Sequence, residues 1–400
     1  MYCAGAFSVR YLRKGSHNYI DIIGLIVRSG GFKMLTGFSV ANFKAFSKKI
    51  DLCLDSPGNY EFNNELIQNG VITKAMVYGY NGCGKSALGL ALFDIILHIT
   101  DKRSEATDYY PYHNLDVAVE EPVSFEYRFR FEESTVIYRY EKKTLDILKK
   151  EVLEIDDKTV IEYDHETQEG RVLLEGAETL NLKSDDSTIS RVKYVRRSAV
   201  LEENHENLVF KKFIDFVDKM LLFYSLDFNR YRGFTTGSES IGKGIIDADK
   251  VSEFERFLHE NNVSIRLDVR ELDGEKILMA RYKNSDVEFF KVTSTGTRSL
   301  ALFYYWYIKM EKASLVFMDE FDAFYHFELA KSIVELLKSL KETQVIITTH
   351  NTDLLSNDLL RPDCYFWLHE SKLDPLCQLT DKELRKAHNL QKMFKAGAFL

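Results

Sequence analysis

The sequence predicts an α/β fold that combines a mixed β-sheet lobe with a helical insertion. Three regions carry this prediction. An apolar run over residues 71–80 enters a glycine-rich loop and continues into an apolar helical segment. The middle of the chain alternates apolar and polar residues, as half-buried strands do. After residue 290, buried strands again alternate with amphipathic helices, which is typical of an α/β architecture.

The 400 residues have the composition of an ordinary globular protein, with 45% hydrophobic and 28% charged residues. The formal net charge of −8 repels phosphate, which argues against a protein that coats DNA, so any bound DNA would need a local groove. The cysteines are scattered without metal-ligand spacing, so we expect free thiols and a cytoplasmic location. They are Cys3, Cys53, Cys83, Cys364 and Cys377.

Residues 1–33 precede the first convincing strand, and we treat them as an unassigned N-terminal extension. The apolar run over residues 20–27 is interrupted by Asp21 and Gly24 and is too short to span a bilayer. No small-residue cleavage site follows it, so a signal peptide is not indicated. We therefore expect no membrane partner.

The elements near the start follow from hydrophobic patterning. Residues 37–46 (GFSVANFKAF) predict a strand with a turn, and residues 71–80 predict a strand that ends at the glycine-rich loop. Residues 85–99 predict one buried helix, because their leucines and isoleucines continue without a breaker after Gly89.

The middle of the chain predicts a β-rich region with a helical block. Residues 123–131 alternate strictly, and shorter strands are expected at residues 135–140, 151–155 and 159–163. Residues 204–226 predict a helical block. Residues 263–272 and 276–282 flank Asp273-Gly274, which is a strong hairpin signal.

The last part of the chain predicts alternating helices and buried strands. Helices are expected at residues 297–312 and 327–340, where apolar residues recur at helical spacing. Buried strands are expected at residues 314–319 and 344–349. No long heptad array occurs, so a coiled-coil arm is not indicated.

Residues 79–86 (GYNGCGKS) fit the Walker A pattern between a strand and a helix. The glycines let successive backbone N–H groups point at phosphates, so the motif predicts ATP binding rather than a chance glycine-rich turn. Lys85 supplies charge to the β and γ phosphates, and Ser86 supplies a hydroxyl ligand to Mg²⁺. Cys83 is expected to be a passenger in the loop. The predicted nucleotide-binding residues here are Asn81, Gly82, Cys83, Gly84, Lys85, Ser86 and Ala87.

Residues 315–320 (LVFMDE) form the matching Walker B pattern. A buried strand would deliver Asp319 to the Mg²⁺ water shell and place Glu320 as the general base for the attacking water. An apolar run that ends in Asp-Glu is common and often structural, but the Walker A motif upstream makes it specific. Because a scaffold that binds ATP without turnover usually lacks this base, Glu320 favours an enzyme that hydrolyses ATP to ADP and phosphate.

Two further segments are candidates for the same site. His350 closes a strand 30 residues after Glu320, where it can contact the γ-phosphate and hold the water. The alternative is a satisfied polar residue at a strand end; the order after Walker B favours the catalytic role. Residues 293–298 (TSTGTR) precede an amphipathic helix, so Ser294 and Gly296 could form an anion site. A plain helix N-cap is the alternative.

The order of these motifs resembles the ABC-type ATPases of the SMC, RecF and OLD (overcoming lysogenization defect) branch. The resemblance covers about residues 35–400, and residues 42–46 (NFKAF) are similar to the first-strand motif of that branch. The tail, from residue 366 onward, resembles the standalone AAA-type ATPases of bacterial anti-phage defence systems, such as PARIS-type systems. The expected fold is therefore an ABC-type P-loop ATPase head.

The resemblance implies that two copies pair head to tail around ATP. Ser294 and Gly296 of one copy would then cap the γ-phosphate held by Lys85 of the other, Arg298 would add charge there, and Asp322 would link the two sites. In this resemblance, residues 293–298 are the signature motif of the ATPase, and they lack the second glycine and the glutamine that transporters have there. No Q-loop glutamine is identified, because Gln68 precedes Walker A and Gln168 lies in a charged turn.

The implied organisation is an ATPase lobe at residues 34–110, a β-rich and helical insertion at 111–290, and a second ATPase lobe at 291–400. The length of the insertion and the lack of a membrane-coupling element disfavour a transporter subunit. The favoured function is a sensor ATPase of anti-phage defence that controls a separate effector, such as a nuclease or toxin. The alternative is a RecF- or SMC-like DNA-repair ATPase that binds duplex DNA.

Overall fold

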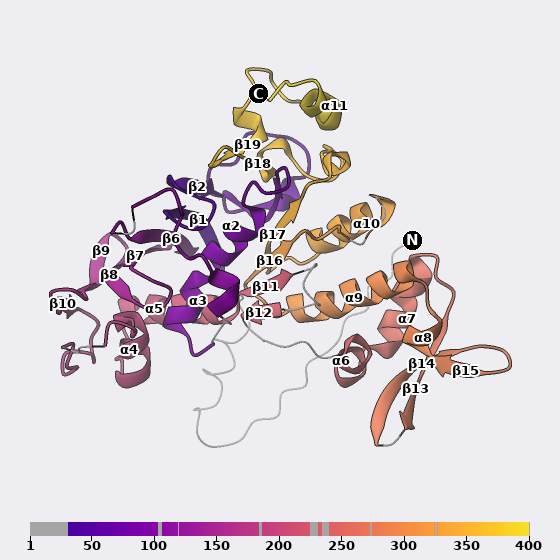
Figure 1. Ribbon diagram of the computed structural model, residues 1–400, viewed down its shortest axis with the longest axis horizontal. Helices are drawn as coiled ribbons and strands as arrows, with labels where there is room; N and C mark the ends of the chain where they lie inside the picture. The colour runs from indigo at the N-terminus through magenta and orange to yellow at the C-terminus, as the bar shows by residue number, and fades with distance from the viewer. Residues whose placement is uncertain are drawn as a thin grey trace, which may run out of the picture. The chain divides into compact units, whose positions relative to one another are not determined.

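Two seven-stranded sheets dominate the part of the chain that the computed structural model describes, which comprises residues 31–102, 106–118, 120–183, 186–224, 231–233, 240–272, 274–323, 325 and 327–399. Figure 1 shows how the strands and helices are arranged. The expectations for residues 1–30, Asp273 and Leu226 lie outside these ranges.

The first sheet is antiparallel, with the order β10-β9-β8-β7-β6-β1-β2. The strict alternation of residues 123–131 is confirmed, because every second side chain of β6 is buried. The three strands that follow it are longer than the sequence predicts. The strands of this sheet are β1 (Lys33–Ala41), β2 (Ile50–Cys53), β6 (Val123–Phe131), β7 (Ser134–Lys142), β8 (Leu148–Ile155), β9 (Lys158–Asp164) and β10 (Glu169–Val172).

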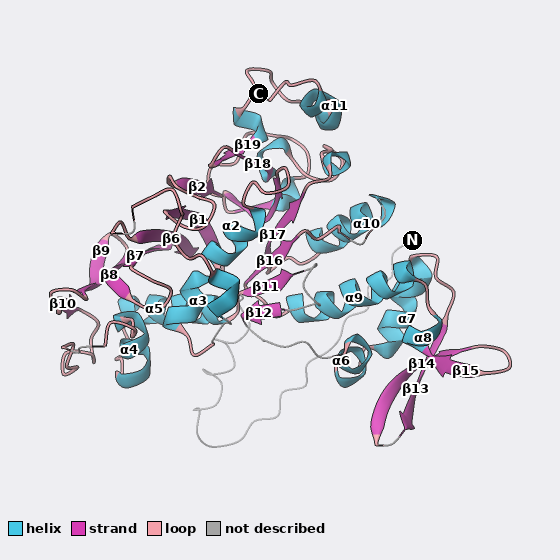
Figure 2. Cartoon of the chain, viewed as in Figure 1, coloured by secondary structure: helices cyan, strands magenta, loops and turns pink. Residues whose placement is uncertain are grey.

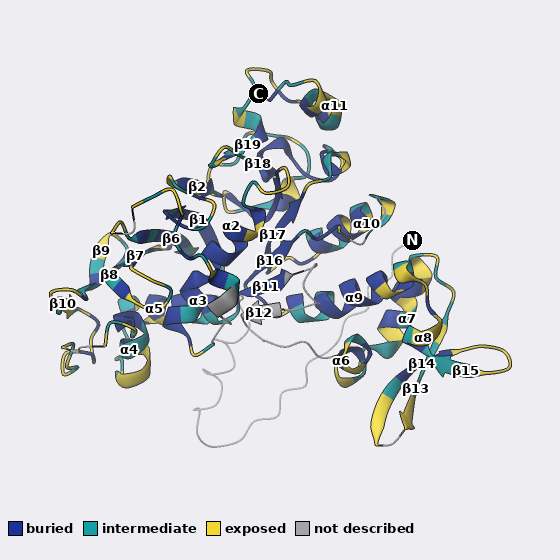
Figure 3. Ribbon diagram, in the orientation of Figure 1, coloured by how far each residue is buried: buried dark blue, intermediate teal, exposed yellow. Residues whose placement is uncertain are grey.

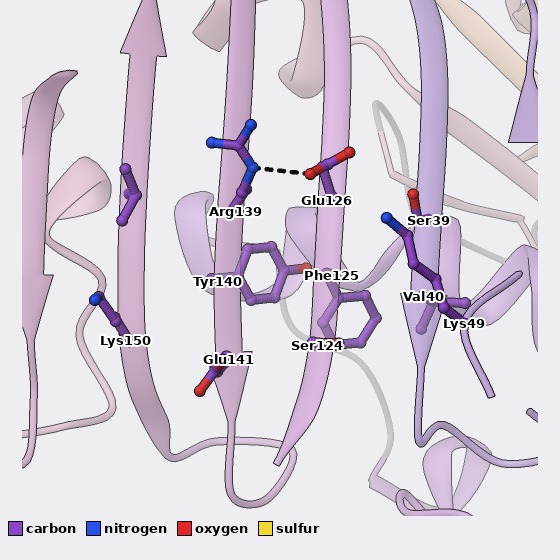
Figure 4. A pocket seen from close by; sticks show the side chains of 11 residues that line it. Ser39, Val40, Lys49, Ser124, Phe125, Glu126, Arg139, Tyr140, Glu141 and Lys150 are labelled. Carbon is purple, nitrogen blue, oxygen red and sulfur yellow. Dashed lines mark hydrogen bonds and ion pairs between the residues drawn. The ribbon is translucent and has the colours of Figure 1, made fainter. Parts of the chain in front are cut away.

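The outer face of this sheet carries ion pairs that join different strands, one of them reaching from β6 across β1 to β2. Arg139 binds Glu126 at 2.8 Å and Glu154 at 2.9 Å, and Arg128 binds Asp51 at 2.7 Å. Figure 4 shows Arg139 pointing toward Glu126 beside a shallow cavity of about 320 Å³. The charges of these arginine and carboxylate side chains are therefore compensated within the sheet.

The inner face of the sheet is tied to a helix by a fully buried ion pair. Asp94, at the start of α3 (Asp94–Ile99), accepts hydrogen bonds from Lys142 Nζ at 2.6 Å and from the Tyr140 hydroxyl at 2.9 Å. Burial disfavours the Asp94 carboxylate, but Lys142 and His98 outweigh this effect, so the pKa of Asp94 is lowered. This contact fixes the antiparallel sheet against the helical layer that follows the Walker A loop.

The second sheet is parallel at its centre and has the order β12-β11-β16-β17-β5-β18-β19. Its central strands are buried on both faces, which Figure 3 shows as dark blue ribbons, as expected for a parallel sheet covered by helices. The two edge strands run antiparallel to their neighbours. The strands are β5 (Lys74–Tyr78), β11 (Leu221–Tyr224), β12 (Tyr231–Gly233), β16 (Leu315–Asp319), β17 (Gln344–Thr349), β18 (Tyr365–His369) and β19 (Lys372–Pro375).

The prediction of a helical block over residues 204–226 is wrong at its end. The helix α5 (His205–Asp218) stops early, and β11 (Leu221–Tyr224) pairs in parallel with β16. A short apolar run is ambiguous from periodicity alone, and here its place beside a buried strand decides the conformation. A strand from the predicted insertion thus belongs to the central sheet.

The prediction of one helix over residues 85–99 is also wrong. The chain forms α2 (Lys85–Leu92) and α3 (Asp94–Ile99), which are separated at Phe93, where φ is −97° and ψ is 1°. The break directs Asp94 to its buried partner Lys142. A tertiary contact therefore outweighs the continuous helical pattern.

The remaining helices pack against different parts of the molecule: α4 (Arg191–Ser198) contacts α3 and β9, and others contact a small hairpin sheet. The predicted hairpin is confirmed, since β13 and β14 pair along their whole length. Figure 2 shows this sheet gathered with α6 and α8. The other elements are β3 (Ile67–Gln68), β4 (Val71–Ile72), β13 (Arg266–Leu272), β14 (Glu275–Arg281), β15 (Asp286–Glu288), α4 (Arg191–Ser198), α6 (Ile241–Asp247), α7 (Val251–Glu260), α8 (Phe289–Val292), α9 (Thr295–Met310), α10 (Phe327–Lys338) and α11 (Leu390–Lys395).

A buried lysine on β5 should make the free energy of unfolding depend on pH. Lys74 Nζ donates to the carbonyl oxygens of Leu340 at 2.9 Å and Thr343 at 2.8 Å. Burial lowers the pKa of Lys74 from 10.5 to about 8. Between these values the unfolded chain binds a proton that the folded protein does not, so the contribution of Lys74 to stability rises with pH. Its slope is at most about 1.4 kcal/mol per pH unit.

The measurement is urea unfolding of the wild type and of Lys74→Met between pH 8 and 10. We expect the wild type to gain stability relative to the variant as the pH rises. Lys392→Met, at an exposed site, serves as the control for replacing a lysine by methionine. A constant difference for Lys74→Met would contradict the buried, neutral lysine.

Candidate active site

The Walker A loop joins β5 to α2 and depends on glycine for its shape. Gly82 and Gly84 have φ of 80° and 108°, in the region that favours glycine. A Cβ atom at Gly84 would lie 2.9 Å from Phe46 Cε1 and 3.0 Å from Ala45 Cβ, so the turn that follows β1 packs directly on the loop. The first-strand motif thus supports the loop, whose tip residue Asn81 is exposed.

Lys85 is almost completely buried beneath this loop, with 4% of its side chain exposed. Its ammonium group donates to the carbonyl oxygens of Gly79 at 2.9 Å and Tyr80 at 3.1 Å. It also pairs with Glu320 Oε1 at 3.1 Å. The Walker A lysine and the Walker B glutamate therefore meet within one chain.

Asp319 ends β16 and is held by two hydroxyl groups. Ser86 Oγ donates to one carboxylate oxygen at 2.6 Å, and Thr348 Oγ1 donates to the other at 2.8 Å. Burial raises the pKa of Asp319, and the two hydroxyl donors oppose this effect. A buried carboxylate beside a serine hydroxyl is suited to a divalent cation, because a bound cation favours the ionised form.

The donor set fits magnesium in particular. Mg²⁺ prefers oxygen ligands and usually takes one or two from the protein, with the others from phosphates and water. Ser86 and Asp319 supply two such oxygens side by side. In the described ranges, no group of three or more His, Cys, Asp or Glu residues could hold a metal ion by itself.

Glu320 lies beyond the strand in a strained backbone conformation. Its φ is 49°, which a residue with a side chain adopts only when its surroundings hold it there. Its backbone N–H donates to Thr348 Oγ1 at 2.8 Å, which fixes the turn. Its carboxylate, with 14% of the side chain exposed, lies 2.8 Å from His350 Nδ1. Glu320 thus contacts both Lys85 and His350.

Thr348 is the residue of this cluster that sequence reasoning missed. Its hydroxyl bonds both to Asp319 and to the backbone of Glu320, so it aligns the two carboxylates. The signal in the sequence was the pair of threonines directly before His350, which end a buried strand next to β16.

Asp322, the residue expected to link two sites, is buried behind the cluster with 8% exposed. Burial raises its pKa, while Thr349 and His350 favour the ionised form. Its Oδ1 atom has no hydrogen-bond partner among the described residues. Asp322 lies beside the end of β17, and its role in linking two sites stays a prediction.

Ser294, Gly296 and Arg298 lie at the start of α9, away from the contacts of Lys85. Ser294 Oγ accepts a hydrogen bond from the Thr297 N–H at 3.3 Å, so it caps the helix. Among the described residues, a Cβ atom at Gly296 would come within 4 Å of Ser294 Oγ alone, at 3.9 Å, so these residues leave space there. No hydrogen bond or ion pair between described residues joins Ser294 or Arg298 to the Lys85–Glu320 cluster.

Cys83 is packed within the loop rather than poised for reaction. Its Sγ lies 2.4 Å from the position that a Cβ of Gly79 would occupy, so a larger residue at position 79 would require Cys83 to shift. Burial raises the pKa of the Cys83 thiol, so the helix N-terminus does not make it a thiolate. The expectation of a passenger residue fits this environment. Cys53, Cys83, Cys364 and Cys377 are free thiols.

The two glutamines considered for a Q-loop are Gln68 and Gln168. Gln68 lies on β3 and its side-chain amide donates to the Lys341 carbonyl at 2.9 Å. Gln168 lies in the turn between β9 and β10 of the antiparallel sheet.

The parallel centre of the second sheet, the glycine-rich loop after β5 and the paired carboxylates at the end of β16 define an α/β fold of the P-loop type, and the predicted α/β fold class with a mixed sheet is confirmed. More particularly, the chain belongs to the family described as "AAA domain, putative AbiEii toxin, Type IV TA system", which matches residues 74–356. None of the curated proteins compared with the sequence matches it. No helix in the described ranges is both long and apolar enough to cross a membrane.

Three of the solved structures that resemble this chain are SMC head domains. The head domain from Thermotoga maritima has a TM-score of 0.43 and 13% identity, and covers 85% of this chain and 97% of that one. A head bound to the C-winged helix domain of ScpA has a TM-score of 0.44 and 13% identity, over 85% and 96%. A head with an extended coiled coil, bound to the C-terminal domain of ScpA from Pyrococcus furiosus, has 0.42 and 11%, over 86% and 96%.

Proposed function

We propose that this chain binds ATP with Mg²⁺ at the Walker A loop and hydrolyses it to ADP and phosphate. The observation that carries the proposal is the contact of Glu320 with both Lys85 and His350, beside the Ser86–Asp319 pair. A charged lysine beneath a glycine loop is suited to phosphate, and an adjacent carboxylate is suited to accept a proton from water.

Each residue of the cluster has a distinct task in this proposal. Lys85 exchanges its contacts with the Gly79 carbonyl and Glu320 for the phosphate, which frees the Glu320 carboxylate to take the proton of the attacking water. His350 keeps that carboxylate oriented. Ser86 and Asp319 would hold Mg²⁺, which would supply positive charge to the phosphate oxygens.

The proposal includes a second copy of the chain. Among the described residues of one chain, no hydrogen bond or ion pair joins Ser294, Gly296 or Arg298 to the cluster, and the space at Gly296 leaves room for an anion at the helix start. A partner copy that presents this helix to the P-loop would complete the pocket. We therefore propose a dimer that closes around ATP.

In the cell, we propose a sensor ATPase of anti-phage defence that controls a separate effector, such as a nuclease or toxin. The family description, which refers to a toxin–antitoxin system, supports this setting. The net charge of −8 does not favour duplex DNA as the regulator. A cytoplasmic location is part of the proposal.

The test is purification from native cells followed by a phosphate-release assay. We expect phosphate release that stops when EDTA removes Mg²⁺, does not change when duplex DNA is added, and accompanies a co-purified nuclease or toxin. Strong stimulation by duplex DNA without a co-purified effector would favour the DNA-repair alternative. If no phosphate were released with Mg²⁺ present, the proposed hydrolysis would be wrong.

A further inference from the structure

The C-terminal helix α11 (Leu390–Lys395) packs against the strand that leads into the Walker A loop. The Phe394 ring stands edge-on to Tyr78, the last residue of β5, with ring centroids 4.8 Å apart. It also contacts Trp367 on the neighbouring strand β18, at 5.0 Å. Phe394 is 8% exposed, so this aromatic cluster anchors the helix.

The same helix holds the turn that follows His350. Asp353 lies in a short 3₁₀ helix over Thr352–Leu354, three residues after His350. Lys395 Nζ lies 3.5 Å from Asp353 Oδ1, and the Gln391 side-chain amide donates to the same oxygen. Gln391 and Lys395 are four residues apart and share one face of α11, so both reach Asp353 together.

The turn between Asp353 and His350 is stiffened by short-range hydrogen bonds. The Asp353 N–H donates to Asn351 Oδ1 at 3.0 Å, and the Asn351 N–H donates to Thr349 Oγ1 at 2.9 Å. Directly after Asp353, the Leu354 carbonyl accepts a hydrogen bond from the Tyr365 hydroxyl at 2.9 Å. These bonds connect Asp353 to the end of β17, which is followed directly by His350, and His350 Nδ1 contacts Glu320.

We propose that α11 is a clamp that positions His350 through Asp353, and that release of this helix slows ATP hydrolysis without weakening ATP binding. The proposal rests on the hydrolytic function given above. Asp353 is a positioning residue, because it acts on His350 through the turn at residues 350–353. A partner protein that lifts α11 would thus control turnover from the C-terminal end of the chain.

The strength of the contacts suits a reversible control. The side chains of Lys395 and Asp353 are 58% and 47% exposed, and exposed ion pairs contribute little to stability. The buried Phe394 ring keeps the helix docked, while the polar contacts to Asp353 can be broken without unfolding the sheet. The turn at residues 350–353 can therefore lose its contacts with α11 while Phe394 still anchors the helix.

The test compares Asp353→Ala and the double variant Gln391→Ala/Lys395→Ala with wild type in the full chain. We expect kcat for phosphate release to fall about tenfold to a hundredfold, as a misplaced catalytic group commonly costs, with the Kd for a non-hydrolysable ATP analogue unchanged. The charge swap Asp353→Lys/Lys395→Asp should recover most of the loss. Lys392→Ala is the control, because Lys392 is exposed on the same helix and its replacement removes one positive charge, as replacement of Lys395 does.

The outcomes separate this clamp from the proposed function. If the wild type hydrolyses ATP and the Asp353 and α11 variants keep its kcat, the clamp is wrong and the hydrolytic function stands. Loss of ATP-analogue binding together with kcat would show a structural role and also overturn the clamp. A wild type that binds ATP without turnover would instead contradict the proposed function.

Discussion

Glu320→Gln should reduce phosphate release by a factor of about a hundred to ten thousand, the usual contribution of a positioned general base. The amide has nearly the shape of the carboxylate and can still meet Lys85 and His350, but it cannot accept the proton of the attacking water. Mg-ATP binding should persist, because the Ser86–Asp319 pair and the glycine loop are untouched. The variant should therefore accumulate as ATP-bound dimers.

The measurement combines single-turnover phosphate release with size-exclusion chromatography in the presence of Mg-ATP. Glu328→Gln is the matched control, since Glu328 is exposed on α10 and its replacement removes the same charge close by in the sequence. The control should release phosphate at the parent rate. Parent-rate release by Glu320→Gln would show that another group is the base.

The arrangement of the candidate site could be predicted from sequence because its residues lie at strand ends with fixed neighbours. Lys85 follows β5 and Glu320 follows β16, and these strands flank β17, whose end carries Thr348 and His350. Parallel strands bring their carboxyl ends to one edge, so the order of the motifs is enough to predict that their side chains meet. The roles assigned to these residues remain predictions.

Other features depend on long-range packing that local patterns do not contain. The helix break at Phe93 follows from the buried pair of Asp94 with Lys142, which is 48 residues away. The strand β11 is defined by its neighbour β16 rather than by its own four residues. The contact of α11 with Asp353 joins positions 38 residues apart through polar side chains that carry no periodic signal. Sequence periodicity predicts which face of a helix or strand a residue occupies, but it does not identify the distant residue that it contacts.

Mixing a Lys85→Ala chain with a Ser294→Ala chain should restore hydrolysis that neither variant has alone. In a mixed dimer, one pocket combines the intact Lys85 of one copy with the intact Ser294 of the other, while the second pocket carries both defects. Random pairing makes about half of the dimers mixed and leaves each with one good pocket of two, so about a quarter of wild-type activity is expected. Phosphate release by equimolar mixtures is the measurement.

The sharpest control uses two defects that the structure places in the same half of the pocket. Lys85 and Glu320 form an ion pair at 3.1 Å within one chain, so both act on the same nucleotide from the same copy. A mixture of Lys85→Ala with Glu320→Gln can therefore form no intact pocket and should stay inactive, although its two chains pair as freely. Recovery in the first mixture but not in the second would require a pocket divided between Lys85 and Ser294. An inactive first mixture, together with a parent monomer that hydrolyses ATP normally, would overturn the shared pocket.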